Sequence, residues 1–226
     1  MCGRYTFTLT QDELERTFDI EVPFPVQPRY NIAPTQQVLA LVLEDGAPRA
    51  RLLRWGLVPH WAEDVRIGNR MINARSESVA SKPAFRNAFQ RRRCLILADG
   101  WYEWKRGRGA KVPYWIHRRD RRPFAFAGLW EIWRGDPAAP LLSCTILTAP
   151  AAPEIRSIYD RMPVVLTPDQ GTRWLDPAAT PAALAELFHP DGTALEAHAV
   201  SPLVNAPVND LPECIEPAAP DGDADA

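Results

Sequence analysis

The chain has 226 residues, of which 46% are hydrophobic and 24% charged, and its formal net charge is −2. These values are typical of a soluble globular protein long enough for one sizeable core, and 23 Pro with 12 Gly fall well short of a disordered composition. No apolar run approaches the ~18 residues of a membrane span, and the start lacks the basic-then-apolar pattern of a signal peptide. We therefore expect a cytoplasmic protein that does not associate with a membrane.

The first half of the chain predicts strands and one short helix. Residues 4–8 alternate as a strand does, and a capping box from Thr10 to Glu13 predicts a helix ending near Asp19. The remaining expected elements are a proline-rich loop at 21–36, a hairpin of strands 38–43 and 49–55, and an aromatic loop at 55–61.

The second half predicts more strands with short helices between them. Residues 71–77 lead into an expected helix that runs to about Arg92 and is interrupted at Pro83. Helices are expected to open at Thr167 and Thr180, each followed by Pro. Strands are expected at 94–98, 113–117, 124–131, 141–148 and 197–200, with a helix end, a turn and a strand at 155–166. Because no long helices separate the strands, the sheet should be mostly antiparallel.

The end of the chain differs in composition. Residues 217–226 are acidic and rich in Ala and Pro, so we expect a disordered tail after a single domain of residues 1–216.

Charge is distributed unevenly along the chain. Residues 49–122 carry 19 of the 26 Lys and Arg but only six acids, so the rest of the chain is acidic. Such a basic block is typical of proteins that bind a phosphate backbone, and Arg suits bidentate phosphate contacts better than Lys. Codon bias and a solvated charged face would explain the excess of Arg over Lys, but they explain the clustering less well.

The four cysteines are widely spaced, without a C-x-x-C motif or a nearby histidine pair. We expect free thiols and no zinc site. Cys94 and Cys144 lie in apolar runs and are expected in the core. Only Cys2 has a position that suggests chemistry.

Cys2 becomes a reactive group if Met1 is removed, which a small second residue favours. It would then carry a free α-amine and a thiol, with ordinary pKa values of about 7.7–8.0 and 8.5, so part of each would be nucleophilic near neutral pH. Together they can close a five-membered thiazolidine ring on an aldehyde. Taken alone, the first five residues favour an ordinary buried cysteine at the start of a strand.

Glu103 and Asn73 are the candidate partners of Cys2. On a strand, Glu103 would lie among indoles, where lost hydration raises a carboxyl pKa and suits it to proton transfer. A salt bridge to one of the many arginines is the structural alternative. Asn73 can hold an amine or a sugar hydroxyl, although by itself it fits a turn-capping residue better.

Six motifs, in order over residues 2 to about 210, match one known family. They are Met1-Cys2-Gly3-Arg4-Tyr5, Tyr30-Asn31-Ile32-Ala33-Pro34, Trp55-Gly56-Leu57-Val58-Pro59, Ile72-Asn73-Ala74-Arg75-Ser76-Glu77, Ala98-Asp99-Gly100-Trp101-Tyr102-Glu103-Trp104 and Asp160-Arg161-Met162-Pro163-Val164. On these motifs the chain resembles the SOS response-associated peptidase (SRAP) family, the abasic-site processing proteins.

The resemblance implies a single α+β domain built on curved, mostly antiparallel sheet with flanking helices. It also implies that Met1 is removed, with self-directed peptidase activity as one route, and that Cys2 forms a covalent thiazolidine with the ring-opened aldehyde of an abasic site in single-stranded DNA. An imine intermediate would permit weak lyase activity. No cofactor and no obligate protein partner are implied, so we expect a monomer.

The resemblance also assigns roles to single residues. Cys2 is the nucleophile, Asn73 orients the site and Glu103 is the acid and base. The residues implied to contact DNA are Arg4, Arg75 and Arg161 at the backbone, and Trp55 and Trp61 in the loop that stacks on bases.

One position departs from the family. Tyr159 stands where the family usually has His before Asp-Arg-Met-Pro. A histidine titrates near 6.5 and exchanges protons at neutral pH, whereas a phenol near 10 is mainly a hydrogen-bond donor. We expect altered rates of imine formation and crosslink reversal rather than loss of crosslinking.

Two other functions stay open on the sequence. An N-terminal-nucleophile amidohydrolase would also expose the Cys2 amine and thiol, but it would not need the arginine block. In a non-catalytic single-strand binder, Cys2 would be incidental.

Overall fold

The computed structural model describes residues 2–106, 110–136, 139–189 and 195–218. The strands are β1 (Tyr5–Phe7), β2 (Arg29–Ile32), β3 (Gln37–Glu44), β4 (Ala47–Trp55), β5 (Asn73–Arg75), β6 (Arg93–Ala98), β7 (Gly100–Lys105), β8 (Val112–Arg118), β9 (Phe124–Trp133), β10 (Leu141–Pro150), β11 (Arg161–Pro163), β12 (Val165–Leu166) and β13 (Leu195–Ala199). The helices are α1 (Gln11–Phe18), α2 (Arg86–Arg91), α3 (Pro153–Arg156), α4 (Pro168–Leu175) and α5 (Pro181–Glu186), with 3-10 turns η1 (Val65–Arg70), η2 (Pro202–Asn205) and η3 (Pro212–Cys214).

The larger sheet closes on itself. Its strand order is β11-β10-β4-β3-β6-β9-β12, and a further pairing of β9 with β10 joins β10, β4, β3, β6 and β9 into a ring. All its pairings are antiparallel except those of β10 with β4 and with β5. The expected curved, mostly antiparallel sheet and the α+β class are confirmed.

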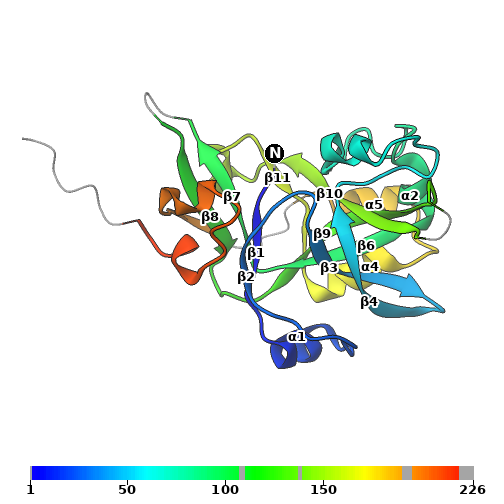
Figure 1. Ribbon diagram of the computed structural model, residues 1–226, viewed down its shortest axis with the longest axis horizontal. Helices are drawn as coiled ribbons and strands as arrows, with labels where there is room; N and C mark the ends of the chain where they lie inside the picture. The colour runs from blue at the N-terminus through cyan, green and yellow to red at the C-terminus, as the bar shows by residue number, and fades with distance from the viewer. Residues whose placement is uncertain (1, 107–109, 137–138, 190–194, 219–226) are drawn as a thin grey trace, which may run out of the picture.

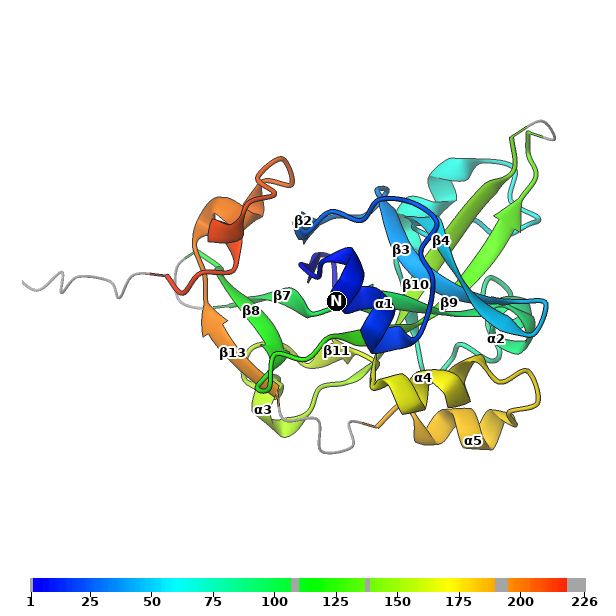
Figure 2. The ribbon, with the colours of Figure 1, turned by 90° about the horizontal axis from the view of Figure 1, so that it is seen from below.

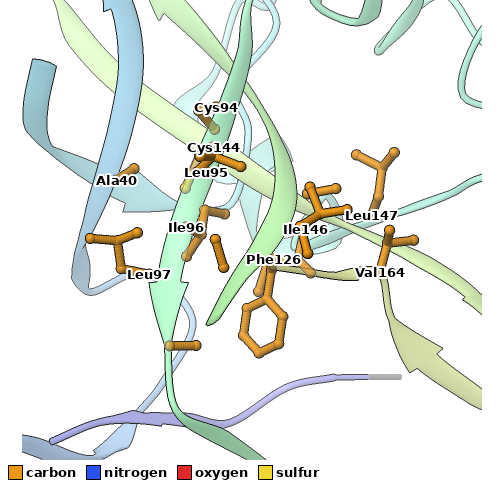
Figure 3. Close-up of a cluster of buried hydrophobic side chains, with 14 of the residues drawn as sticks. Ala40, Cys94, Leu95, Ile96, Leu97, Phe126, Cys144, Ile146, Leu147 and Val164 are labelled. Carbon is orange, nitrogen blue, oxygen red and sulfur yellow. The ribbon is translucent and has the colours of Figure 1, made fainter. Parts of the chain in front are cut away.

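Buried apolar side chains fill the ring. Figure 3 shows Ile96, Phe126, Cys144 and Ile146 converging from β6, β9 and β10. Cys94 and Cys144 are fully buried, as the apolar runs predicted. Burial of each large side chain of this kind stabilises the fold by about 1.5–3 kcal/mol.

The smaller sheet has the order β13-β8-β7-β1-β2 and carries the start of the chain. Tyr5 on β1 lies opposite Trp101 on β7. Its ring packs edge-on against Trp55 and Phe126 of the larger sheet, at centroid distances of 5.4 and 5.5 Å. Tyr5 therefore joins the two sheets and places Cys2 at their junction, where Figure 1 shows the blue start of the chain between β7 and β11.

Helices α1, α4 and α5 lie outside the ring and begin where the sequence predicted. Capping boxes at Thr10 and Thr167 open α1 and α4, and the Thr180 side chain caps α5. Trp174 on α4 is fully buried and donates to the Cys94 carbonyl at 3.0 Å, which fastens α4 to β6. Figure 2 shows α4 and α5 together, away from β7, β8 and β13. No described helix is both long and apolar enough to cross a bilayer.

Two local expectations were wrong. The predicted loop at 21–36 contains β2, which pairs with β1 and whose Tyr30 and Asn31 amides donate to Asp210 at 2.5 and 2.9 Å. The helix predicted from residues 71–77 to Arg92 is instead β5, a series of turns and the short α2. Both differences arise from partners far away in the sequence, since β5 pairs with β10.

Little of the expected tail falls within the described residues. Pro217 bridges to Val200, and the Ala218 amide donates to the Ala199 carbonyl at 2.8 Å. Residues 219–226 lie outside the described residues.

Candidate active site

Cys2 lies at the junction of the two sheets with no exposed surface. The Asn73 side-chain amide donates to the Cys2 carbonyl at 2.7 Å, although the two residues are 71 positions apart. The Cys2 Sγ lies 3.9 Å from the Arg4 carbonyl oxygen. A side chain of β5 thus fixes the backbone of the candidate nucleophile.

The Cys2 thiol is held in its protonated form. Burial raises its pKa well above the ordinary value, and the negative charge of Glu103 raises it further. The ordinary thiol pKa therefore does not apply to Cys2 while Met1 is attached, and the partly ionised thiol expected after removal of Met1 stays a prediction. Cys2 needs a base to take its proton as it reacts.

Glu103 on β7 is a suitable group for that transfer. Its side chain is buried, with 3% of the residue exposed. Burial raises its pKa to about 7, the charge of Asp160 raises it too, and the positive charge of the amino terminus opposes the rise. The direction agrees with the sequence prediction. Near neutral pH this carboxyl is present in both forms, so it can donate and accept protons.

Asn73 presents an open acceptor. It begins β5, opposite Ile146 in the parallel ladder with β10, and the Trp55 indole N–H donates to the Ile72 carbonyl beside it at 2.9 Å. Its Oδ1 is buried and has no hydrogen-bond partner among the described residues. Because buried carbonyl oxygens rarely lack a partner, this atom is a position where an N–H or O–H of a ligand would bind.

Arg4 is bound by the protein itself. Its Nη1 donates to Asn31 Oδ1 at 2.8 Å and to the Val204 carbonyl at 2.7 Å, and its guanidinium lies 5.8 Å from the ring centre of Trp104. Arg4 therefore fastens β1 to the C-terminal segment. Asn31 has the same role, because its amide donates to three carbonyls of that segment.

Arg75 and Arg161 lie near each other along β10. Arg75 is exposed and is opposite Thr148, whereas Arg161 is opposite Pro150 and donates to the Thr148 carbonyl at 2.7 Å. Arg161 also donates to both oxygens of Glu77, at 2.7 and 3.0 Å. Arg75 and Arg161 thus both lie beside β10. Arg4 has other partners, since it is bonded to Asn31 and Val204.

The two candidate tryptophans differ. Trp55 is fully buried against Tyr5, so it offers no face to a base and the stacking role expected of it is wrong. Trp61 is 51% exposed and stays a candidate. The loop between them turns at Gly56, where φ is +125° and an added Cβ would lie 2.6 Å from the Gly68 carbonyl oxygen. This close contact packs the loop on η1.

Tyr159 lies half-buried between α3 and β11. It lines a cavity of about 380 Å³ with Lys105, Arg156 and Asp160 among the other lining residues. Lys105 follows Glu103 by two residues on β7, and Asp160 affects the Glu103 pKa, so this cavity lies beside the acid. Tyr159 therefore belongs to the surroundings of Glu103.

The roles of Asp210 and Glu77 were missed by the sequence reasoning. Asp210 pairs with Arg29 and accepts from the amides of β2, and nothing local in the sequence marks it. Glu77 closes the motif that begins with Ile72, so the motif contained its signal.

Comparisons with known proteins agree with this geometry. The family model described as SOS response associated peptidase (SRAP) matches residues 1–207. The chain is 44% identical over 222 residues to the abasic site processing protein YoaM of Bacillus subtilis, covering 96% of this chain and 98% of that protein. It is 34% identical over 183 residues to the abasic site processing protein YedK of Escherichia coli, covering 77% and 79%. A crystal structure of a Bacteroides thetaiotaomicron protein has the same fold, with a TM-score of 0.87 at 23% identity over 96% of this chain and 100% of that one.

Proposed function

This chain belongs to the SOS response associated peptidase (SRAP) family, and we propose that it processes abasic sites in single-stranded DNA by forming a covalent thiazolidine through Cys2. The crosslink would shield the lesion during DNA repair. The observation that carries the proposal is the meeting of three groups at the sheet junction: the buried thiol of Cys2, a Glu103 carboxyl with a pKa of about 7, and the open Oδ1 of Asn73.

The first step is release of the Cys2 amine. Water adds across the Met1–Cys2 peptide bond, Met1 leaves as the free amino acid, and Cys2 keeps a neutral or protonated α-amine. The family description as a peptidase supports self-directed cleavage at this bond. The hydrogen bond from Asn73 to the Cys2 carbonyl holds the residue in place before and after the cleavage.

The second step joins protein and DNA. The neutral α-amine attacks the C1′ aldehyde of the ring-opened deoxyribose and gives a carbinolamine. Protonated Glu103 then donates a proton to the departing hydroxyl, which leaves as water, and a protonated imine remains. The open Oδ1 of Asn73 is suited to accept a hydrogen bond from the amine or from the carbinolamine hydroxyl.

The third step closes the ring. The Cys2 sulfur adds to the imine carbon while Glu103, now a carboxylate, takes the thiol proton that burial has retained. The ring nitrogen keeps the one hydrogen that it carried in the protonated imine, and Glu103 is protonated again, so the sum of the second and third steps is the loss of one water. If a base instead removes a C2′ proton from the imine, the 3′ phosphate leaves, which accounts for the proposed weak lyase activity.

Surface charge supports DNA as the ligand. Exposed Arg75 lies two residues from Asn73 on β5, and half-exposed Trp61 offers a face for a base. We propose that these two side chains hold the single strand while Cys2 reacts. The protein is proposed to act as a monomer in the cytoplasm, without a metal or organic cofactor.

One gel tests the function against the alternatives. The protein is incubated with abasic and with intact single-stranded oligonucleotides, denatured and separated. A shifted band with abasic DNA alone, lost in Cys2→Ala, supports crosslinking. An N-terminal-nucleophile amidohydrolase or a non-catalytic binder would give no shifted band with either DNA.

A further inference from the structure

The Arg161–Glu77 pair occupies a defined place beside the proposed site. Arg161 Nη2 donates to the Thr148 carbonyl, and Thr148 lies opposite Arg75, two residues beyond Asn73 on β5. Because a strand rises by about 3.3 Å per residue, the backbone of Arg75 lies about 7 Å along β5 from that of Asn73. The residue before Arg161 is Asp160, whose charge raises the pKa of Glu103.

Glu77 occupies both terminal nitrogens of this arginine. Its two oxygens accept from Nη1 at 2.7 Å and from Nη2 at 3.0 Å, which is the bidentate geometry that fixes a guanidinium most strongly. The hydrogen bonds lower the pKa of Glu77 to about 2, so the carboxylate is charged at neutral pH. The pair therefore contributes almost no net charge.

One donor of Arg161 is left open. Its Nε is buried and has no hydrogen-bond partner among the described residues, although 13% of the side chain is exposed. A buried N–H of this kind calls for an acceptor. Nη1 carries a second N–H as well, but Nε–H is the donor that is buried without a described acceptor.

We propose that Glu77 is a positioning residue that fixes Arg161 and cancels its charge, so that Arg161 serves the abasic site through Nε–H as a donor to an uncharged oxygen of the opened deoxyribose. This inference rests on the proposed function and refines it. Arg75 is then the cation that attracts the phosphate backbone, whereas Arg161 orients the sugar.

Salt dependence and rate separate these roles. Each cation that neutralises a phosphate of a single strand adds about 0.7 to the slope of log affinity against log salt. In Glu77→Gln the carboxylate charge is lost and Arg161 is free to meet a phosphate. We expect the slope for intact single-stranded DNA to steepen by about 0.7, while crosslinking at saturating abasic DNA slows about tenfold or more because the donor is no longer fixed.

Two further variants control for charge and for geometry. Glu186→Gln removes the same charge and breaks a comparable surface contact, with Arg173 at 3.1 Å, and should change neither slope nor rate. Glu77→Asp keeps the charge but shortens the side chain, so it should keep the slope and lower the rate.

The contrary results are equally definite. Tighter binding by Glu77→Gln with unchanged or faster crosslinking would mean that Glu77 merely competes with DNA for Arg161, and the inference would be wrong. It would also be wrong if slope and rate both matched the wild type.

A measurement on the free protein is independent of the crosslinking chemistry. The side-chain nitrogen NMR spectrum of the wild type should show slow exchange of the Arg161 Nε proton and hindered rotation of its guanidinium. Both should be lost in Glu77→Gln and kept in Glu186→Gln, and a mobile Arg161 in the wild type would overturn the inference. If wild-type protein forms no crosslink at all, the proposed function fails, while this spectrum and the binding slopes still decide the role of Glu77.

Discussion

The two sides of the candidate site differ in what surrounds their polar groups. On the β1 and β7 side, Cys2 and Glu103 are buried, and burial raises both pKa values. On the β5, β10 and β11 side, Arg75 is exposed and Arg161 is paired with the exposed Glu77. Low hydration shifts proton equilibria, whereas exposure leaves charges available to a polyanion. The first side is thus suited to bond formation and the second to holding DNA.

The largest effect should come from Cys2→Ala, which tests whether the buried side alone makes the bond. We expect no crosslinked band with abasic DNA and unchanged affinity for intact single-stranded DNA, because the groups proposed to bind DNA lie on the other side. Denaturing and native gels of the same samples measure the two properties. Intact mass should also show Cys2 as the first residue of the active wild type, and an active protein that retains Met1 would contradict the mechanism.

Glu103→Gln should give the next largest effect. General acid–base assistance contributes about 10²–10⁴-fold, so crosslinking should slow by a factor in this range without abolition. The wild-type rate should fall above pH about 7, where Glu103 loses the proton needed to expel water, and also at lower pH as the Cys2 amine becomes protonated. In Glu103→Gln the alkaline fall should disappear. An unchanged pH profile would remove Glu103 from the proton transfers.

The same variant has a consequence for stability. Since the folded-state pKa of Glu103 is raised above its unfolded value, the folded chain retains a proton that the unfolded chain loses. Its stabilising contribution is therefore full below about pH 4.5 and is lost as the pH rises to about 7. Denaturant unfolding at several pH values should show this loss in the wild type and not in Glu103→Gln.

Arg75→Ala should have a smaller effect, confined to binding. Arg75 is exposed, so its loss should reduce the salt slope for single-stranded DNA by about 0.7 and leave the crosslinking rate at saturating DNA near the wild-type value. Arg49→Ala is a control with an exposed arginine from a different strand, β4. An equal reduction of the salt slope in the two variants would mean that general surface charge, and not Arg75 on β5, holds the single-stranded DNA.

Sequence-based prediction succeeded where the signal was local. The capping boxes at Thr10 and Thr167 and the hairpin of β3 and β4 depend on residues within a few positions of one another. It failed where distant segments decide the structure. β5 is a strand because β10 lies beside it, and a helical pattern in residues 71–92 could not reveal that.

The site shows the same division. Motif similarity predicted Cys2, Asn73 and Glu103 as site residues, and the structure brings the three together. The direction of the Glu103 pKa shift followed from its aromatic neighbours in sequence. The full burial of Trp55 could not be predicted from the sequence, because an aromatic loop near glycine and proline also fits an exposed surface. The raised pKa of the Cys2 thiol could not be predicted either, because it depends on how the two sheets enclose the side chain.

The smallest expected effect concerns Tyr159, which lines a cavity together with Lys105 and Asp160. A phenol acts mainly as a hydrogen-bond donor, so Glu103 and water should do most of the proton transfer. Tyr159→Phe should therefore change crosslinking only a few-fold. Tyr159→His adds a group that titrates near neutral pH and should speed reversal of a preformed crosslink, measured as release of oligonucleotide into excess competitor abasic DNA. If Tyr159→Phe were as inactive as Cys2→Ala, the phenol would be an essential catalyst, and the assignment of proton transfer to the buried side alone would fall.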